Sequence, residues 1–285
     1  MIRCPVCGSK ECKVTGRDRF IEDTEYARCL DCKSGFAARS LSSLGKVYDA
    51  FHGTDDYASE KFFDNEMRHI LRLSPWYLKR LSRFKKSGRL LDIGCGRGQF
   101  IYKASQTGNW QCVGLDVSKN AAEYAKKYFG LDLIVSEFSP EIFGEQKFDV
   151  IYMRHLVEHI ENPHQFLAQV KKVCAPGAVL AVHLPNESSW TNSFKRICYR
   201  FGINKDFGSL RFPYHPVGYN PKSLRLLFES AGFKHLDTRT YSKLNPHFDI
   251  HFRPWDILLI PFSILDTLPA KGHIIIAYFK FENQP

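Results

Sequence analysis

The spacing of apolar and polar residues changes repeatedly along the chain, and each change predicts a new element. Residues 89–94, RLLDIG, form a short apolar run that ends in an acid and a glycine, as a buried strand does. Further strand-like runs are predicted at residues 111–117, 131–136, 148–155, 178–185, 234–241 and 272–281. Helical spacing lies between them, at residues 97–106, 118–129, 163–173 and 221–231. Strands that alternate with helices predict a parallel sheet covered by helices on both faces.

The stretch before this alternation, residues 41–88, is expected to be a helical connection. Its apolar positions follow a helical spacing that Pro75 interrupts, so the pattern predicts two short helices. These apolar positions are Ile70, Leu71, Leu73, Trp76, Leu78 and Leu81. Such helices either cover the mouth of a site on the following domain or serve ordinary packing.

Residues 1–40 carry two pairs of cysteines. Cys4 and Cys7 form one CxxC knuckle, Cys29 and Cys32 form another, and 21 residues separate the two. Four thiolates satisfy the tetrahedral preference of zinc and leave no open coordination position, which predicts a structural zinc ribbon rather than a catalytic metal. The residues between the knuckles suit a short hairpin. A ribbon of this kind either binds nucleic acid or braces the neighbouring domain, and unmetallated thiols are the alternative.

Three glycines at alternate positions, Gly94, Gly96 and Gly98, follow the first strand of the main domain. They predict a tight strand-to-helix turn at the carboxyl edge of the sheet, where ligands of such folds bind. A dinucleotide fingerprint would need a further glycine where the chain has Gln99. Asp92 would repel a diphosphate but suits a ligand with an ammonium group. Asp116, at the end of the second strand, is placed to accept hydrogen bonds from ribose hydroxyls.

These residues carry a family resemblance. The pattern D-x-G-x-G-x-G, the acid after the second strand and the segment FDVIYMRHLVEHIENP resemble class I S-adenosylmethionine-dependent methyltransferases over residues 89–281. The chain is similar to the ubiquinone-biosynthesis O-methyltransferase group and its relatives in polysaccharide and secondary-metabolite clusters. The resemblance implies an α/β fold, a Rossmann-like seven-stranded doubly wound sheet with an antiparallel last strand, to which the small zinc ribbon is added.

The resemblance also implies a set of cofactor contacts. The glycines would lie beside the methionine and ribose portions, the acid of the second strand on the ribose, Glu137 and Phe138 near the adenine, and Met153 with Arg154 beneath the sulfonium. The expected cofactor-binding residues are Asp92, Gly94, Gly96, Gly98, Asp116, Val117, Glu137, Phe138 and Met153.

Histidines are the candidates for a catalytic base. An alcohol or amine acceptor loses a proton on methylation, and histidine is the usual base near neutral pH. Four histidines are expected near the mouth of the site: His155, His159, His183 and His215. We expect His215 to act as the base or to position the acceptor, with His155 as the next candidate, while a structural hydrogen bond is the alternative role for each.

A second metal ion is a weaker hypothesis. His155, Glu158 and His159 stand at i, i+3 and i+4, which places them on one face of a helix. The resemblance argues against a metal there, because metal-binding relatives carry an acid where this chain has a histidine, and a structural pair is the alternative.

Two insertions are expected in the methyltransferase domain, which spans residues 89–285. Residues 185–220 mix basic and aromatic side chains. This mixture suits a lid over a phosphorylated or nucleotide-bearing acceptor, a surface on which RNA bases stack, or a solvated surface loop. Residues 245–271 are strongly apolar, and 255–268 would either touch a membrane surface or pack against the sheet or a second subunit.

The composition of the chain bears on its cellular compartment and on the state of its cysteines. The chain has 285 residues, a formal net charge of +10 and nine cysteines. It shows neither an apolar signal-peptide stretch nor a run long enough to span a bilayer, so we expect a cytoplasmic protein with thiols or metal ligands rather than disulfides. The leading hypothesis is methyl transfer from S-adenosylmethionine to an oxygen of a small-molecule or sugar acceptor in a biosynthetic pathway, with a polysaccharide pathway as one option. The alternatives are an RNA methyltransferase, disfavoured by the absence of an Asn-Pro-Pro-Tyr type tetrad, and a non-catalytic interaction module.

Overall fold

A mixed sheet of seven strands forms the centre of the molecule. The computed structural model describes residues 2–18, 24–38, 60–203, 207–210, 212, 214–242 and 260–282, with residues 60–69 described by their backbone. The sheet order is β10-β11-β8-β7-β4-β5-β6. Its strands are β4 (Gly88–Ile93), β5 (Trp110–Asp116), β6 (Ile134–Val135), β7 (Phe148–Arg154), β8 (Cys174–Pro185), β10 (Phe233–Tyr241) and β11 (Ile274–Phe281). Strands β4, β5, β6, β7 and β8 pair in parallel, whereas β11 runs antiparallel to both neighbours, which confirms the predicted topology.

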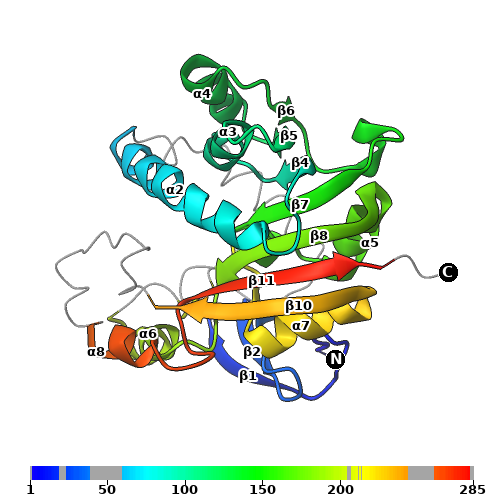
Figure 1. The fold of residues 1–285 in the computed structure, drawn as a ribbon. Helices are drawn as coiled ribbons and strands as arrows, with labels where there is room; N and C mark the ends of the chain where they lie inside the picture. Colours follow the sequence, from blue (N-terminus) through cyan, green and yellow to red (C-terminus); the bar gives the residue numbers. More distant parts are fainter. Residues whose placement is uncertain are drawn as a thin grey trace.

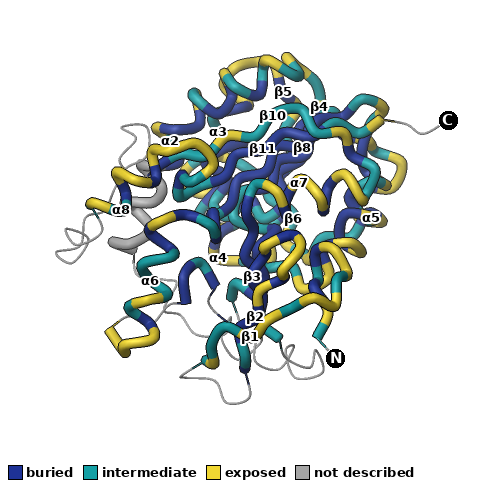
Figure 2. Tube along the Cα trace, turned by 90° about the horizontal axis from the view of Figure 1, so that it is seen from below, coloured by how far each residue is buried: buried dark blue, intermediate teal, exposed yellow. Residues whose placement is uncertain are grey.

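Helices cover both faces of this sheet (Figure 1). They are α2 (Glu60–Leu81), α3 (Gln99–Ser105), α4 (Lys119–Phe129), α5 (Pro163–Val173) and α7 (Pro221–Ser230). One buried core includes apolar side chains of α5 and α7, and a second core on the other face includes those of α2 and α3. The central strands β8 and β11 are dark blue, or buried, along most of their length in Figure 2. Helix α4 begins at the predicted N-cap, where the Ser118 hydroxyl accepts the Ala121 N–H.

The prediction of two short helices around Pro75 is wrong. One 22-residue helix, α2, runs through the proline. A proline inside a helix removes one backbone hydrogen bond and costs about 3 kcal/mol. Burial of Leu73, Tyr77 and Leu81 against the sheet offsets this cost. The Ser74 hydroxyl, one residue before the proline, donates to the Ile70 carbonyl at 2.7 Å. Tertiary packing therefore decides the conformation here.

The third predicted strand, residues 131–136, is shorter than expected. Only Ile134 and Val135 join the sheet, as β6 at its edge. The reason is that Leu131 and Leu133 pack inward. The Leu131 side chain lies 3.1 Å from where a Cβ on Gly98 would stand, and the Leu133 side chain lies 2.8 Å from the corresponding position on Gly114. The segment therefore covers the glycine turn instead of extending the ladder.

A second, four-stranded sheet joins the N-terminal cysteine module to the first insertion. Its order is β1-β2-β3-β9, from β1 (Cys12–Arg17), β2 (Glu25–Cys29), β3 (Gly35–Ala38) and β9 (Val217–Gly218). The hairpin expected between the knuckles is β1 and β2, which pair antiparallel. The fourth strand comes from residues about 180 positions further along the chain, a pairing that no local pattern predicts.

The two insertions pack on one another. The first contains α6 (Trp190–Arg200), and the second contains α8 (Ile260–Leu265). Phe194 and Phe262 stack with ring centroids 4.0 Å apart, and the buried Asp266 accepts the Trp190 N–H at 2.7 Å. Residues 255–259 of the segment expected to touch a membrane lie outside the described residues. In the part that the structure describes, no helix is long and apolar enough to cross a bilayer.

Candidate active site

The predicted glycine turn connects β4 to α3. Gly94, Gly96 and Gly98 have φ values of 72°, 53° and 77°, in the left-handed region that favours glycine. Gly98 is also the N-cap residue of α3, so the amide groups at the start of this helix lie beside the turn. A Cβ on Gly96 would have no other heavy atom within 4 Å, apart from those of its chain neighbours. The turn therefore offers a backbone surface that a ligand can approach closely.

Asp92 places a buried carboxyl directly beneath this turn. Asp92 is only 2% exposed to solvent. Burial raises the pKa of Asp92 well above its usual range, the charge of Asp116 raises it further, and the nearby Arg154 guanidinium opposes both. A carboxylate in this position gains from a cationic partner, which is what an amino group of a ligand would supply.

Asp116, at the end of β5, shapes the same edge. Its Oδ2 accepts the Gly96 N–H at 2.7 Å, and its Oδ1 accepts the Ser118 N–H at 3.0 Å. Each carboxylate oxygen retains a further lone pair, so the half-buried group is oriented by the turn and still able to accept hydroxyl donors.

The other expected cofactor contacts differ in their surroundings. Val117 and Glu137 are exposed near the edge of the sheet, and Phe138 is half-buried against Phe166 at 5.6 Å between ring centroids. Met153 is fully buried in the core on the α5 side. Arg154 points to the opposite face, where its side chain hydrogen-bonds Tyr77 of α2 and its charge acts on the buried acid of β4.

His155 and Glu158 form a hydrogen-bonded pair immediately after β7. The His155 Nδ1 lies 3.0 Å from Glu158 Oε1, and the two side chains are 34% and 3% exposed. His155 adopts φ of 50°, uncommon for a residue with a side chain. Burial opposes the charged form of Glu158, yet the hydrogen bond from His155 and the neighbouring histidines hold the pKa of this carboxyl below its usual range.

His159 and His215 complete this cluster. Their rings meet edge to face with centroids 4.6 Å apart. The His215 Nδ1 lies 2.9 Å from the Ser209 carbonyl oxygen, which can only accept, so Nδ1 carries the proton and Nε2 is left as an acceptor. Burial lowers the pKa of His159 to about 4. Glu158, His159 and His215 each offer one ligand atom, and these three atoms lie within 4.8 Å of one another. Among the described residues, the group that could hold a cation here therefore contains His215 in place of the His155 expected from the sequence.

Two buried polar atoms in the described part of this region lack a hydrogen-bond partner. They are Glu158 Oε2 and the hydroxyl of Tyr219, a fully buried residue beside β9. The charge of Glu158 contributes to raising the pKa of Tyr219, second to burial, which indicates that the two groups are neighbours. Sequence reasoning missed Tyr219, and no spacing in the sequence relates it to the acid.

His183 belongs to a different environment from the other three histidines. It is buried at the end of β8 on the α2 face, with its Nδ1 3.2 Å from the Tyr152 hydroxyl. Its ring lies 4.4 Å from that of Tyr77, and burial lowers the pKa of His183 well below its usual range. The structure therefore brings together three of the four predicted histidines and assigns the fourth to the core.

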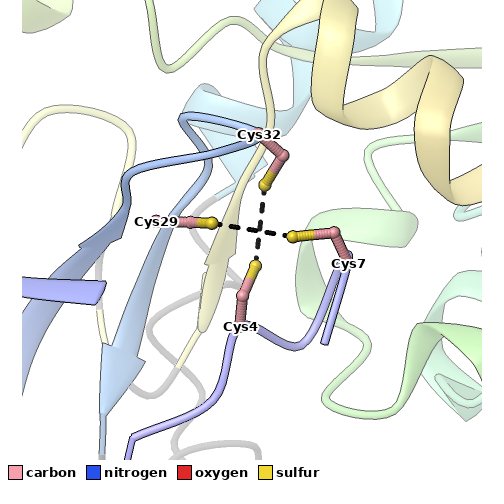
Figure 3. Close-up of side chains that lie close together, drawn as sticks. All are labelled: Cys4, Cys7, Cys29 and Cys32. Carbon is pink, nitrogen blue, oxygen red and sulfur yellow. Dashed lines mark hydrogen bonds between the residues drawn. The ribbon is translucent and has the colours of Figure 1, made fainter. Parts of the chain in front are cut away.

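The four knuckle cysteines converge in the N-terminal module (Figure 3). The Sγ atoms of Cys4 and Cys32 are 3.6 Å apart, as are those of Cys7 and Cys29, and all four lie within 4.8 Å of one another. Four sulfurs around a common centre at these separations match a tetrahedral zinc site with metal–sulfur bonds of about 2.3 Å. Cys12 stays outside the cluster, with its thiol directed to the Ser9 carbonyl oxygen.

Comparison with known proteins agrees with this geometry. A family model described as a methyltransferase domain matches residues 57–238. A ubiquinone biosynthesis O-methyltransferase of a Caulobacter species is 32% identical over 144 residues, which are 45% of this chain and 56% of that protein. The mitochondrial ubiquinone biosynthesis O-methyltransferase of Dictyostelium discoideum is 26% identical over 114 residues, 35% of this chain and 36% of that protein. The chain thus spans between about a third and about half of the length of these curated relatives.

Solved structures share the fold. A SAM-dependent methyltransferase from Archaeoglobus fulgidus superimposes with a TM-score of 0.53 at 20% identity, covering 78% of this chain and 99% of that one. The plantazolicin methyltransferase BpumL, solved with a pentazolic desmethylPZN analog and SAH, gives a TM-score of 0.53 at 18% identity over 82% of this chain and 93% of its own. The chain belongs to the class I S-adenosylmethionine-dependent methyltransferases.

Proposed function

We propose that the protein transfers a methyl group from S-adenosylmethionine to an oxygen of a small-molecule or sugar acceptor. The observation that carries this proposal is the arrangement at one edge of the sheet. The buried Asp92 and the half-buried Asp116 flank the glycine turn, and the histidine cluster follows the adjacent strand β7. The family supports the cofactor, and the relatives named as O-methyltransferases support the acceptor atom.

The residues at the glycine turn would hold the cofactor. Asp92 would pair with the ammonium of the methionine portion, which stabilises a carboxylate that is otherwise costly to bury. Asp116 would accept the ribose hydroxyls, and Glu137 with Phe138 would border the adenine. When bound, S-adenosylmethionine supplies a methyl group on a sulfonium whose departure leaves a neutral thioether. The protein must then mainly orient the acceptor and exclude water.

His155 is the residue that we propose as the base. The buried Glu158 fixes its Nδ1 and leaves Nε2 directed away from the carboxylate, to receive the proton of an acceptor hydroxyl. The His155 side chain is a third exposed, whereas that of Glu158 is buried, so the histidine is the better placed of the two to contact an acceptor. His215, the first candidate from the sequence, remains the alternative base, because its Nδ1 is bonded to the Ser209 carbonyl oxygen and its Nε2 is the nitrogen left for an acceptor.

The four-cysteine cluster is proposed to hold a structural zinc ion. Cys4, Cys7, Cys29 and Cys32 supply four thiolates and thus fill a tetrahedral coordination sphere. No position is left for a water or a substrate, so this metal would contribute folding energy and not chemistry.

The function is tested by supplying labelled S-adenosylmethionine and the purified protein to a cell extract. We expect label in the small-molecule or glycan fraction, where mass spectrometry identifies an added methyl on oxygen. Label in the RNA fraction, with salt-dependent RNA binding, would support the RNA methyltransferase instead. Absence of S-adenosylmethionine binding in calorimetry would support a non-catalytic module.

A further inference from the structure

The cysteine module and the first insertion share one sheet. Strand β3 pairs antiparallel with β9, with Gly35 opposite Gly218 and Phe36 opposite Val217, and the Ala37 N–H donates to the Pro216 carbonyl at 2.8 Å. Both glycines permit close approach. A Cβ on Gly218 would stand 3.0 Å from Glu187 Cγ, and one on Gly35 would stand 3.0 Å from Leu210 Cδ1. Both glycines thus leave room for side chains of the insertion, and backbone hydrogen bonds join the ribbon to β9.

A small aromatic core joins the same two segments. Tyr26 of the ribbon hairpin stacks on Phe207 of the insertion, with ring centroids 4.7 Å apart and planes within 2°. Tyr199, Leu210 and Phe212 complete this cluster, which is separate from the two cores of the main sheet. The Tyr199 hydroxyl also donates to the Arg17 carbonyl at 3.0 Å. The buried aromatic residues of the insertion therefore depend on the ribbon for their burial.

Asn220 ties the second cysteine knuckle to the main domain. Its side-chain amide donates to the Cys32 carbonyl at 3.0 Å, and its Oδ1 accepts the Ser223 N–H at the start of α7. A single side chain thus contacts a metal-binding turn and caps a helix of the methyltransferase fold. The same segment carries His215, whose ring meets that of His159 with centroids 4.6 Å apart.

A chain of hydrogen bonds continues from this junction to His215. The Glu187 N–H donates to the Tyr219 carbonyl at 2.7 Å. The buried Glu187 carboxylate accepts from the Arg196 guanidinium and from the Ser209 N–H, the latter at 3.0 Å. The Ser209 carbonyl in turn accepts the His215 Nδ1 proton. Arg196, one of the basic side chains of the first insertion, is engaged in this internal network.

We propose that the four-cysteine ribbon is a positioning element of the acceptor side of the active site. With its metal bound, it holds residues 215–220 against Glu158 and His159. Without the metal, residues 215–220 lose their order. The glycine turn, which is proposed to bind the cofactor, keeps its structure because it belongs to the other sheet. The inference rests on the proposed function only for the role of residues 215–220 beside the acceptor. The coupling between metal binding and the order of these residues is a property of the fold.

The coupling is tested by hydrogen exchange of the full chain, followed by mass spectrometry, with bound zinc quantified in parallel. The variant Cys32→Ser removes a zinc ligand, and Cys12→Ser is its matched control, because Cys12 lies in the same module outside the cluster. In Cys32→Ser, we expect peptides covering residues 215–220 to exchange at least about tenfold faster, and those covering 89–117 to change by less than about twofold. Cys12→Ser should match the wild type in both.

A second variant addresses the case in which loss of the metal unfolds more than the ribbon. Asn220→Asp keeps the oxygen that caps α7 and loses the donor to the Cys32 carbonyl. We expect it to retain zinc and still to accelerate exchange at residues 215–220 by about threefold or more. If these residues keep their protection in both variants while residues 2–38 lose theirs in Cys32→Ser, the ribbon is an independent module and the proposal is wrong.

Binding of S-adenosylhomocysteine separates this inference from the proposed function. Calorimetry with S-adenosylhomocysteine should give affinities within about threefold for wild type, Cys12→Ser and Asn220→Asp. An affinity that falls with the loss of protection at residues 215–220 would contradict a role confined to the acceptor side. Absence of binding to the wild type would refute the proposed function, and the exchange experiment would still decide the coupling.

Discussion

The two halves of the active site are built in different ways. The proposed cofactor side comes largely from one contiguous stretch, in which β4, the glycine turn, α3 and β5 lie within residues 88–116. The proposed acceptor side combines the end of β7, the first insertion and the N-terminal ribbon, which are widely separated in sequence. A contiguous turn can be recognised from its residue pattern, whereas a surface assembled from distant segments depends on pairings that only the folded chain reveals.

This difference predicts that variants on the two sides separate affinity from turnover. His155→Gln should have the largest effect. It removes the proposed base and should lower kcat by about 10²- to 10⁴-fold, with affinity for S-adenosylmethionine unchanged. Steady-state kinetics with the acceptor identified in extract, together with calorimetry, measure the two quantities. His183→Gln is the comparison variant, since the buried His183 lies outside the cluster, and a larger loss of kcat there would refute the assignment.

Asp92→Asn should separate cofactor affinity from the stability of the empty protein. The variant keeps the shape of the buried side chain and removes its charge. Affinity for S-adenosylmethionine should fall by about 30- to 100-fold, because the ammonium loses its partner. The ligand-free protein should become more stable by about 1 kcal/mol, because burial disfavours the carboxylate. Calorimetry and thermal unfolding without ligand test both signs, and a loss of stability in the ligand-free variant would contradict the account.

Asp116→Asn should have a smaller effect on the same side. The Gly96 and Ser118 N–H groups donate to different oxygens of Asp116, and the variant replaces one of these oxygens with an NH2 donor, so one N–H group loses its acceptor. We expect about a tenfold weaker affinity for S-adenosylmethionine and little change in kcat at saturating cofactor. Glu137→Gln is a control at the exposed adenine end, and it should change affinity by less than Asp116→Asn does.

The histidine cluster of the acceptor side should also make the stability of the fold sensitive to acid. The pKa of His159 in the folded chain is lowered to about 4, so the unfolded state binds more protons between that value and its ordinary pKa. Stability is therefore lost as the pH falls from about 6.5 towards 4, by on the order of 2 kcal/mol. The lowered pKa of Glu158 acts in the same direction at more acidic pH. Melting temperatures of wild type and His159→Gln over this range measure the effect, and equal pH dependence in both would contradict it.

The same contrast explains what the sequence could predict. The left-handed glycines after β4, the N-cap at Ser118 and the convergence of two CxxC knuckles follow from local rules, and the structure confirms each. The continuous helix through Pro75 could not be predicted, because packing against the sheet offsets the local cost of the proline. Met153 is buried in the core on the α5 side, and its expected contact with the cofactor stays a prediction.

Non-local pairing accounts for the rest. In the pairing of β3 with β9, Gly35 lies opposite Gly218, which is 183 positions further along the chain. No local sequence pattern at either glycine predicts this pairing. The proximity of Tyr219 to Glu158 follows from that pairing. The second insertion, expected to pack or to touch a membrane, contacts the first through Phe262, and its residues 243–259 lie outside the described part of the chain.

The central claim is that the bend after β4 binds a sulfonium nucleoside between two acids, and a crystal structure with S-adenosylhomocysteine tests it most directly. The account predicts that the amino group of this ligand lies within hydrogen-bond distance of Asp92 and that both ribose hydroxyls contact Asp116. Electron density for the ligand at another place, with the glycine bend empty, would contradict it.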